Sequence, residues 1–380
     1  MGSNLSVSSY ALTAFEIINE IYISIGAGVL GLIVLTEYGI RNSSIIRTLL
    51  MTTVTAGSLL FIFQCTQEEE PSPNKVIFIT GCDSGLGFSL AQHACESGFT
   101  VLAGCLKLDS KGAKELRNLF GNNIHHIEID VTRSTSVEVA VEVTDRFLKS
   151  NPNYRLWAII NNAGVMVFGE FEWLTERLIQ DQLNINLAGS MRVTKAFCPL
   201  LRQHQGRLIV ISSHCALATL PGLSVYGATK AGLLAWCDGL RVELKKYGVD
   251  VISFIPGSFP QHSNIMANQV ENCYEMHSSF TPEQREFYGE YFKRYNSYLS
   301  VISGPKVITK INDLSLYKKF DKALLEVPPK TLYIHEPFKY SIYHILFKHT
   351  PVRIRDYLVT QFMQMPEYTA RTGSLPGGIA

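Results

Sequence analysis

The sequence has almost no net charge and no block of basic residues. Its 380 residues include 34 Lys and Arg against 33 Asp and Glu, a formal net charge of +1. Proteins that bind nucleic acid through its phosphates carry a basic patch, and the sequence has no basic block. A nucleic-acid partner is therefore not expected.

The eight cysteines lack the spacing of a metal or redox site. They are scattered from Cys65 to Cys273, and none forms a CxxC pair. A disulfide framework is not implied in a chain of this length. We therefore expect buried free thiols and no metal. The sequence also has no internal repeat and no low-complexity tract.

Charge is also missing from two apolar runs near the N-terminus. Ile21–Thr36 and Thr48–Cys65 contain no Asp, Glu, Lys or Arg, and each is close to the roughly 17 residues that a membrane-spanning helix needs. A cleaved signal peptide fits poorly because no Lys or Arg precedes the first run. We predict that residues 1–66 form a membrane anchor with one or two spans, whose orientation stays open.

The residue pattern changes after the predicted anchor. Residues 67–74 (QEEEPSPN) are polar, contain two prolines and are typical of a linker. Beyond them, short β-rich runs alternate with longer helical stretches, which predicts a doubly wound parallel sheet in a single α/β domain. The predicted strands are Lys75–Thr80, Thr100–Ala103, Ile127–Ile129, Leu156–Ile160, Arg207–Ile211 and Val249–Ile255. The predicted helices are Phe88–Ser97, Lys111–Phe120, Ser136–Lys149, Glu176–Gln203 and Ser224–Tyr247.

We place this domain at residues 75–264. Residues 265–380 are less regular and are predicted to supply a substrate loop and a C-terminal helical extension. Within that extension, Phe338–Val359 mixes aromatic and basic residues. It is compatible with a helix on a membrane surface and equally with a helix packed on the domain by its aromatic face.

A glycine-rich turn follows the first predicted strand and opens the first predicted helix. This is the context in which backbone N–H groups and the helix N-terminus hold a pyrophosphate, as in Rossmann-type folds. The spacing is GxxxGxG. The residues predicted to bind a dinucleotide here are Gly81, Asp83, Ser84, Gly85, Leu86 and Gly87.

Two further strand ends carry candidate cofactor residues. Asp130, followed by Val131, has two compatible roles, accepting a hydrogen bond from adenine or capping the next helix. Asn162, Ala163 and Gly164 are small or amide residues that let the backbone approach a flat ligand.

The end of the second strand contains neither the acid that selects NAD nor an Arg suited to NADP. Lys107 lies close by, so the choice between the two nucleotides stays open on these residues alone.

The reacting groups are predicted from a conjunction of residues. Tyr226 and Lys230 are four apart on one helix face, and a nearby cation lowers the pKa of a tyrosine towards neutrality. The pair therefore suits acid–base catalysis. Ser213 ends the fifth strand, where its hydroxyl is expected to hold the substrate oxygen. Asn186 lies within a predicted helix, where a polar amide needs a reason.

Over about Lys75–Asn264 these motifs resemble the short-chain dehydrogenase/reductase superfamily. The resemblance implies that Asn186, Ser213, Tyr226 and Lys230 form a catalytic tetrad. In it, Lys230 also holds the nicotinamide ribose and Asn186 holds a water. It further implies that Pro256 and Gly257 form a turn beside the nicotinamide.

A narrower resemblance concerns the substrate. TGCDSGLGFSLAQ and the AGCL strand end are similar to the retinol and 3-hydroxybutyrate dehydrogenase branch. LWAIINNAGV, the paired apolar runs and the tail around PVRIRDY are similar to 17β-hydroxysteroid dehydrogenases of type 2. This implies an endoplasmic-reticulum membrane enzyme that oxidises steroid alcohols with NAD, with NADP not excluded. A homodimer through the two longest helices is a family expectation.

Other functions stay open. They are a retinol or other lipid-alcohol dehydrogenase, an NADPH-dependent reductase of lipid ketones, and an idle nucleotide-binding membrane scaffold. We expect an apolar pocket over the nicotinamide and consider His214, beside Ser213, a loop histidine without a catalytic role. The predicted pocket walls are Phe168, Phe171, Trp173, Leu217, Leu220, Leu223 and Phe259.

Overall fold

The computed structural model describes residues 51, 55, 67–257, 259, 263–302, 308–363 and 365–369. The chain divides into two compact units, Met1–Gln67 and Glu68–Ala380. The two predicted membrane spans lie outside the described residues, apart from Met51 and Thr55, which are helical. Within the described ranges, every helix is too short or too polar to cross a bilayer.

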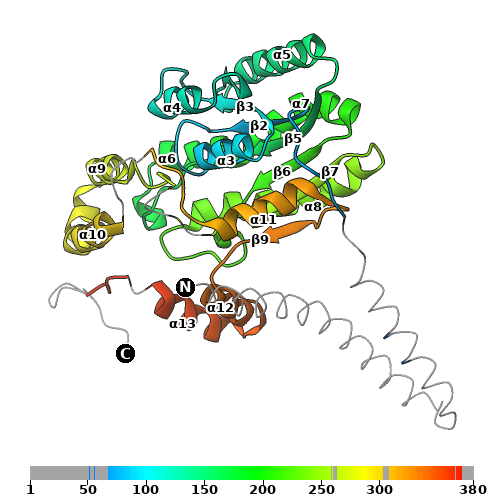
Figure 1. The fold of residues 1–380 in the computed structure, drawn as a ribbon. Coiled ribbons are helices and arrows are strands. Elements are labelled where there is room, and N and C mark those ends of the chain that lie inside the picture. Colours follow the sequence, from blue (N-terminus) through cyan, green and yellow to red (C-terminus); the bar gives the residue numbers. More distant parts are fainter. Residues whose placement is uncertain are drawn as a thin grey trace, which may run out of the picture. The chain divides into compact units, whose positions relative to one another are not determined.

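A seven-stranded sheet forms the centre of the second unit (Figure 1). Its order is β4-β3-β2-β5-β6-β7-β9, and all neighbouring strands are parallel. The chain runs outward in both directions from β2 and β5, so the predicted doubly wound topology is confirmed. The strands are β2 (Lys75–Thr80), β3 (Thr100–Cys105), β4 (Ile124–Glu128), β5 (Arg155–Asn161), β6 (Arg207–Ile211), β7 (Asp250–Ile255) and β9 (Leu332–Ile334).

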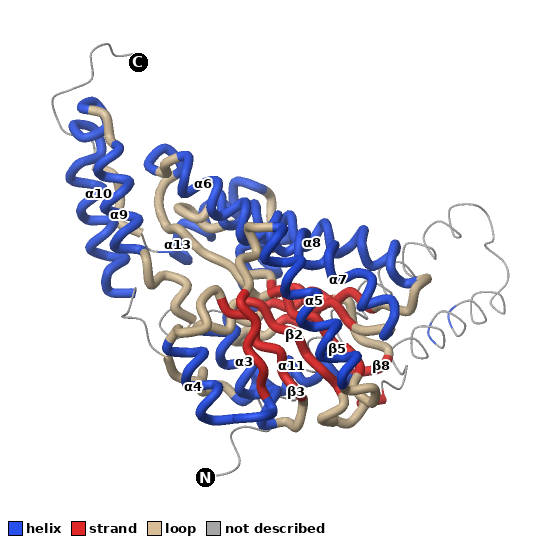
Figure 2. Tube along the Cα trace, turned by 90° about the horizontal axis from the view of Figure 1, so that it is seen from above, coloured by secondary structure: helices blue, strands red, loops and turns tan. Residues whose placement is uncertain are grey.

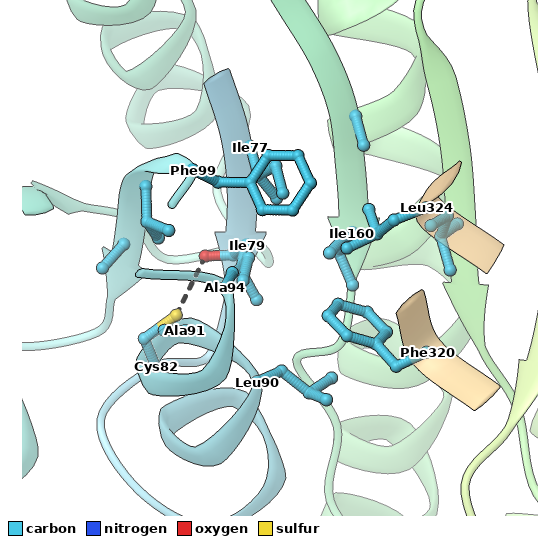
Figure 3. Close-up of a cluster of buried hydrophobic side chains, with 14 of the residues drawn as sticks. Ile77, Ile79, Cys82, Leu90, Ala91, Ala94, Phe99, Ile160, Phe320 and Leu324 are labelled. Carbon is cyan, nitrogen blue, oxygen red and sulfur yellow. Dashed lines mark hydrogen bonds between the residues drawn. The ribbon is translucent and has the colours of Figure 1, made fainter. Parts of the chain in front are cut away.

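Helices cover both faces of this sheet (Figure 2). On one face, α3 (Gly85–Glu96), α4 (Lys111–Phe120) and α11 (Leu314–Leu325) bury a core that includes Phe320 and Leu324 (Figure 3). On the other face lie α5 (Ser134–Ser150), α7 (Ser190–His204) and α8 (Ser224–Lys245). Because both faces are covered, the central strands contain continuous apolar runs rather than alternating apolar and polar residues, and every residue of β2 is buried.

The C-terminal part adds helices outside these layers. Its helices are α9 (Gln269–Ser279), α10 (Pro282–Ile302), α12 (Phe338–His349) and α13 (Val352–Met363). The short elements are β1 (Gln67–Glu68) and β8 (Glu326–Val327), which pair with each other, and the single turns η1 (Gly121–Asn123), η2 (Phe171–Trp173) and η4 (His214–Ala216).

Several elements differ from the sequence prediction, among them the third strand, which was predicted at Ile127–Ile129 and spans Ile124–Glu128. The helix predicted at Glu176–Gln203 is α6 (Glu176–Gln182), a π-helical segment η3 (Leu183–Gly189) and then α7. The strand β9 was not predicted, because its three residues lie in an irregular region with no period of their own. It pairs with β7 and extends the sheet by one strand.

Candidate functional site

The glycine turn is shaped to receive an anion. Gly81 and Gly85 have φ of 75° and 62°, which only glycine adopts without strain. Ser84 caps α3 through its backbone alone, with no side-chain hydrogen bond and no acidic residue in the first turn. The N–H groups of that turn have no intrahelical acceptor. The turn therefore fits the pyrophosphate of a dinucleotide.

The end of β5 is tied to this turn by hydrogen bonds. The Asn162 amide donates to the carbonyl of Thr80 over 2.8 Å. The hydroxyl of Thr80 in turn accepts from the backbone of Asn162 and of Ala163, each over 3.0 Å. Thr80 thus sets the distance between the two strand ends at which the topology reverses, a role that the sequence analysis missed.

The two candidate acids are engaged in different ways. Asp83 accepts from the backbone N–H groups of Leu106 and Lys107 over 2.7 and 3.1 Å, which joins the glycine turn to the end of β3. Asp130 accepts from the backbone and hydroxyl of Thr132 over 2.9 and 2.6 Å. The N-cap of α5 is Arg133, so the alternative that Asp130 caps this helix is wrong.

A cavity of about 740 Å³ runs along the carboxyl ends of the strands. It begins at the glycine turn and continues past Tyr226 to the side chains of α12 and α13. The predicted site residues that line it are Gly81, Asp83, Ser84, Leu86, Gly87, Asp130, Val131, Asn162, Ala163, Gly164, Ser213, Tyr226, Lys230, Pro256 and Gly257.

Gly85 and Asn186 are the two predicted residues that do not line this cavity. Gly85 is needed for packing, since a Cβ there would lie 2.0 Å from the carbonyl oxygen of Ser263. Asn186 is fully buried behind the cavity wall.

The side chain of Asn186 is occupied by the protein itself. Its amide donates to the carbonyl of Val165 over 2.9 Å and to the hydroxyl of Thr229 over 3.1 Å, and its oxygen accepts from the Val165 backbone over 2.8 Å. Thr229 in turn donates to the carbonyl of Tyr226 over 2.7 Å. The amide therefore fastens the loop after β5 to the helix that carries Tyr226. Thr229 lies within YGATK, but nothing in that motif indicated this role.

Tyr226, Lys230 and Ser213 meet at the middle of the cavity. The ammonium of Lys230 lies 5.8 Å from the centre of the Tyr226 ring and donates to the carbonyl of Ile211 over 3.0 Å. The Ser213 hydroxyl acts on Tyr226 and lowers the pKa of its phenol. Because Ser213 and Ile211 belong to the end of β6 and both reacting groups to α8, packing of α8 on the sheet brings the three side chains together.

Burial dominates the ionisation of the pair. It raises the pKa of Tyr226 well above its usual value, against a smaller lowering by the Ser213 hydrogen bond. It also lowers the pKa of Lys230 to about 8. The expectation that Lys230 brings the pKa of Tyr226 towards neutrality is therefore wrong for the ligand-free protein, because desolvation outweighs any attraction from the cation.

The far part of the cavity is mostly apolar and aromatic. Phe168, Leu220, Leu223 and Phe259 line it as predicted. The other three predicted wall residues do not: Phe171 and Leu217 are exposed, and Trp173 is buried among the tyrosines of α10. Side chains of the C-terminal helices, which the sequence analysis did not assign to the wall, replace them: Tyr340, Tyr343, Phe347, Phe362 and Met363. This favours the interpretation of α12 as a helix packed on the domain by its aromatic face.

Comparison with known proteins gives the family. The profile of the short chain dehydrogenases matches residues 75–272. Rat estradiol 17-beta-dehydrogenase 2 is 30% identical over 330 residues, covering 84% of this chain and 83% of the relative. Rat retinol dehydrogenase 7 is 34% identical over 292 residues, covering 75% and 87%.

Other similarities are more limited. Mouse mitochondrial D-beta-hydroxybutyrate dehydrogenase is 42% identical over 194 residues, but the match spans only 50% of this chain and 56% of the relative. A crystal structure of a short-chain dehydrogenase from Streptomyces avermitilis shares the fold, with 22% identity, a TM-score of 0.57 and coverage of 78% of this chain and 97% of that one. From the profile match and the long alignments, the chain belongs to the short chain dehydrogenase family.

Proposed function

We propose that the protein is an oxidoreductase that transfers a hydride between NAD(P) and the hydroxyl or ketone carbon of a lipophilic substrate. One observation carries the proposal: Ser213, Tyr226 and Lys230 line the same cavity as the glycine turn, whose helix has no side-chain N-cap. A protein that only bound a nucleotide would need the turn but not the three polar side chains beyond it.

NAD(P) held at the glycine turn would supply the acceptor for the hydride of the carbinol carbon, or its donor in the reverse direction. The proton of the substrate hydroxyl passes to the phenolate oxygen of Tyr226. Ser213 donates a hydrogen bond to the same substrate oxygen. We propose that the ammonium of Lys230 favours the phenolate over the phenol once the nucleotide is bound, since in the ligand-free protein burial keeps the pKa of Tyr226 raised. Asn186 acts as a positioning residue through Thr229, since its side-chain hydrogen bonds go to Val165 and Thr229.

We propose NAD as the physiological cofactor, with NADP as the second candidate. At the end of β3, the Asp83 carboxylate holds the backbone of Leu106 and Lys107. A carboxylate beside the end of β3 supports NAD over NADP, because the 2′-phosphate of NADP is bound best next to a cation. Lys107 is exposed at the same turn, and its positive charge is the reason that NADP stays a candidate cofactor.

We propose a steroid alcohol as substrate and a retinoid as the next candidate. The aromatic cavity wall from α12 and α13 is evidence for a rigid, largely apolar substrate. The long alignments are with an estradiol dehydrogenase and a retinol dehydrogenase. The small, charged 3-hydroxybutyrate would leave most of that wall without contacts.

The membrane anchor at residues 1–66 and location in the endoplasmic reticulum are also proposed, on the strength of the two uncharged runs. Extraction of membranes at alkaline pH tests the anchor. The full chain should stay in the pellet, and a chain that begins at Gln67 should be released. A truncated chain that also stays in the pellet would place the anchor elsewhere.

We further propose a homodimer that pairs through α7 and α8, the family expectation. Light scattering of the detergent-solubilised protein, with the detergent mass subtracted, tests it. A mass of one chain would contradict the proposal.

The activity is tested by nicotinamide absorbance with the detergent-solubilised full chain. NAD and NADP are each offered with steroid alcohols, retinol and 3-hydroxybutyrate. The Tyr226→Phe variant should lose turnover by about 10²–10⁴-fold while it still binds nucleotide. Tyr247→Phe, an exposed tyrosine on the segment after α8, is the matched control and should be fully active. Nucleotide binding without turnover of any substrate would support the idle scaffold instead.

A further inference from the structure

Three side chains that bind metals in other proteins meet on one wall of the cavity. His214 comes from η4, directly after Ser213. Glu336 follows β9, and His344 lies on α12 (Figure 1). The ligand atoms of the three groups all lie within 4.8 Å of one another. Sequence spacing gave no sign of this site, because η4 is far from the other two residues along the chain.

One carboxylate oxygen is shared by both imidazoles. Glu336 Oε2 lies 2.6 Å from Nδ1 of His344 and 3.2 Å from Nδ1 of His214. The two rings are stacked, with centroids 4.6 Å apart and planes 17° apart. All three side chains are nearly buried, with exposed fractions of 11–14%.

His214 is left without adequate hydrogen bonds. Both of its ring nitrogens are buried, and neither makes a hydrogen bond of good geometry with the described residues. A buried polar atom of this kind requires an explanation, and a bound cation would supply one. The 3.2 Å contact between its Nδ1 and Glu336 lacks the geometry of a hydrogen bond.

We propose that His214, Glu336 and His344 form a binding site for a divalent transition-metal ion, with Zn²⁺ the best match. Two imidazole nitrogens and one carboxylate oxygen are a donor set that Zn²⁺ takes, and three protein ligands leave one coordination position open. His214 and His344 line the cavity, so that position is accessible from it. A bound ion would fasten α12 to the turn beside Ser213. The inference is independent of hydride transfer.

The proposal is tested on the full chain in detergent, purified through a tag without histidine and stripped of metal with a chelator. Added Co²⁺ should give the visible absorption of a low-symmetry site, saturating at one ion per chain, and Zn²⁺ should abolish it. Zn²⁺ alone should raise the Tm. Absence of any Co²⁺ absorption, or no Tm rise with Zn²⁺, would overturn the proposal.

Variants assign the ligands. Glu336→Gln, His344→Asn and His214→Asn should each weaken Co²⁺ binding at least 10-fold. His349→Asn, at the exposed end of the same helix α12, is the matched control and should bind as the natural chain does. Nucleotide binding by each variant shows that it is folded. Folded variants that still bind Co²⁺ with unchanged affinity would overturn the proposal.

Discussion

At the scale of single residues, the burial of Lys230 makes the stability of the fold depend on pH. Burial lowers its pKa to about 8 in the folded chain, against 10.5 for an exposed lysine. Between these values the unfolded chain binds more protons than the folded one, so this residue makes stability rise with pH. The penalty for burying the ammonium is full below pH 8 and is relieved as the pH rises.

We therefore expect Lys230→Met to remove this pH dependence. Between pH 7 and 9.5, the unfolding free energy of the natural chain should rise relative to that of the variant by about 2 kcal/mol. Tyr226, whose pKa is raised by burial, opposes the trend only above pH 10. Urea denaturation at several pH values measures the difference. A difference that stays constant over this range would show that Lys230 is not desolvated.

The sequence identified the reacting residues because each follows a strand or begins a helix in a recognisable motif. Tyr226, Lys230 and Ser213 were found in this way and do line one cavity. Asn186 was singled out as a polar amide inside a predicted helix, but its hydrogen bonds to Val165 and Thr229 depend on which loop packs against η3. No local pattern encodes such a contact.

At the scale of elements, the start of α4 supports the glycine turn. Gly112 lies so close to this turn that a Cβ would be 2.1 Å from the carbonyl oxygen of Asp83. A Cβ added at Gly239 in α8 would have no neighbouring atom within 4 Å. Both glycines lie in helices and have ordinary φ values. Comparing alanine at the two positions therefore distinguishes the effect of a close packing contact from that of helix propensity.

We expect opposite effects of alanine at these two positions. Gly112→Ala should lower the unfolding free energy by about 1–3 kcal/mol, because the backbone of the turn must move. It should also weaken nucleotide binding. Gly239→Ala should raise stability by up to about 1 kcal/mol and leave binding unchanged. Denaturation curves and nucleotide titrations measure both effects, and equal outcomes for the two variants would contradict the packing argument.

Strands with continuous apolar runs were predicted well. Lys75–Thr80 and Arg207–Ile211 are strands with the predicted bounds, since their apolar runs are covered on both faces. The conformation within the helix at 176–204 was not predicted, because a switch from α to π hydrogen bonding leaves the spacing of apolar residues almost unchanged. The three residues of β9 become a strand only because the edge of β7 is available to them.

At the scale of the whole molecule, two parts of the chain divide the cavity between them. The sheet, with the loops that follow its strands, provides the nucleotide end, and the C-terminal helices provide much of the apolar wall. The sequence predicts that such an extension exists, but not where it packs. Its position depends on contacts between aromatic side chains that lie far apart along the chain.

This division predicts that a chain ending at Pro337 separates the two binding functions. It loses α12 and α13, and with them Tyr340, Tyr343 and Phe347 of the cavity wall. The glycine turn and the ends of β2 and β5 remain, so nucleotide affinity should stay as in the full chain. Each lost aromatic contact with an apolar substrate is worth about 1.5–3 kcal/mol when fully buried, so KM should rise at least ~10-fold. Deletion of residues 370–380 alone is the control and should leave KM unchanged.

Nucleotide titration and steady-state kinetics on the same preparations measure both quantities. An unchanged KM in the chain that ends at Pro337, with nucleotide binding intact, would mean that the substrate is held by the sheet-side loops alone.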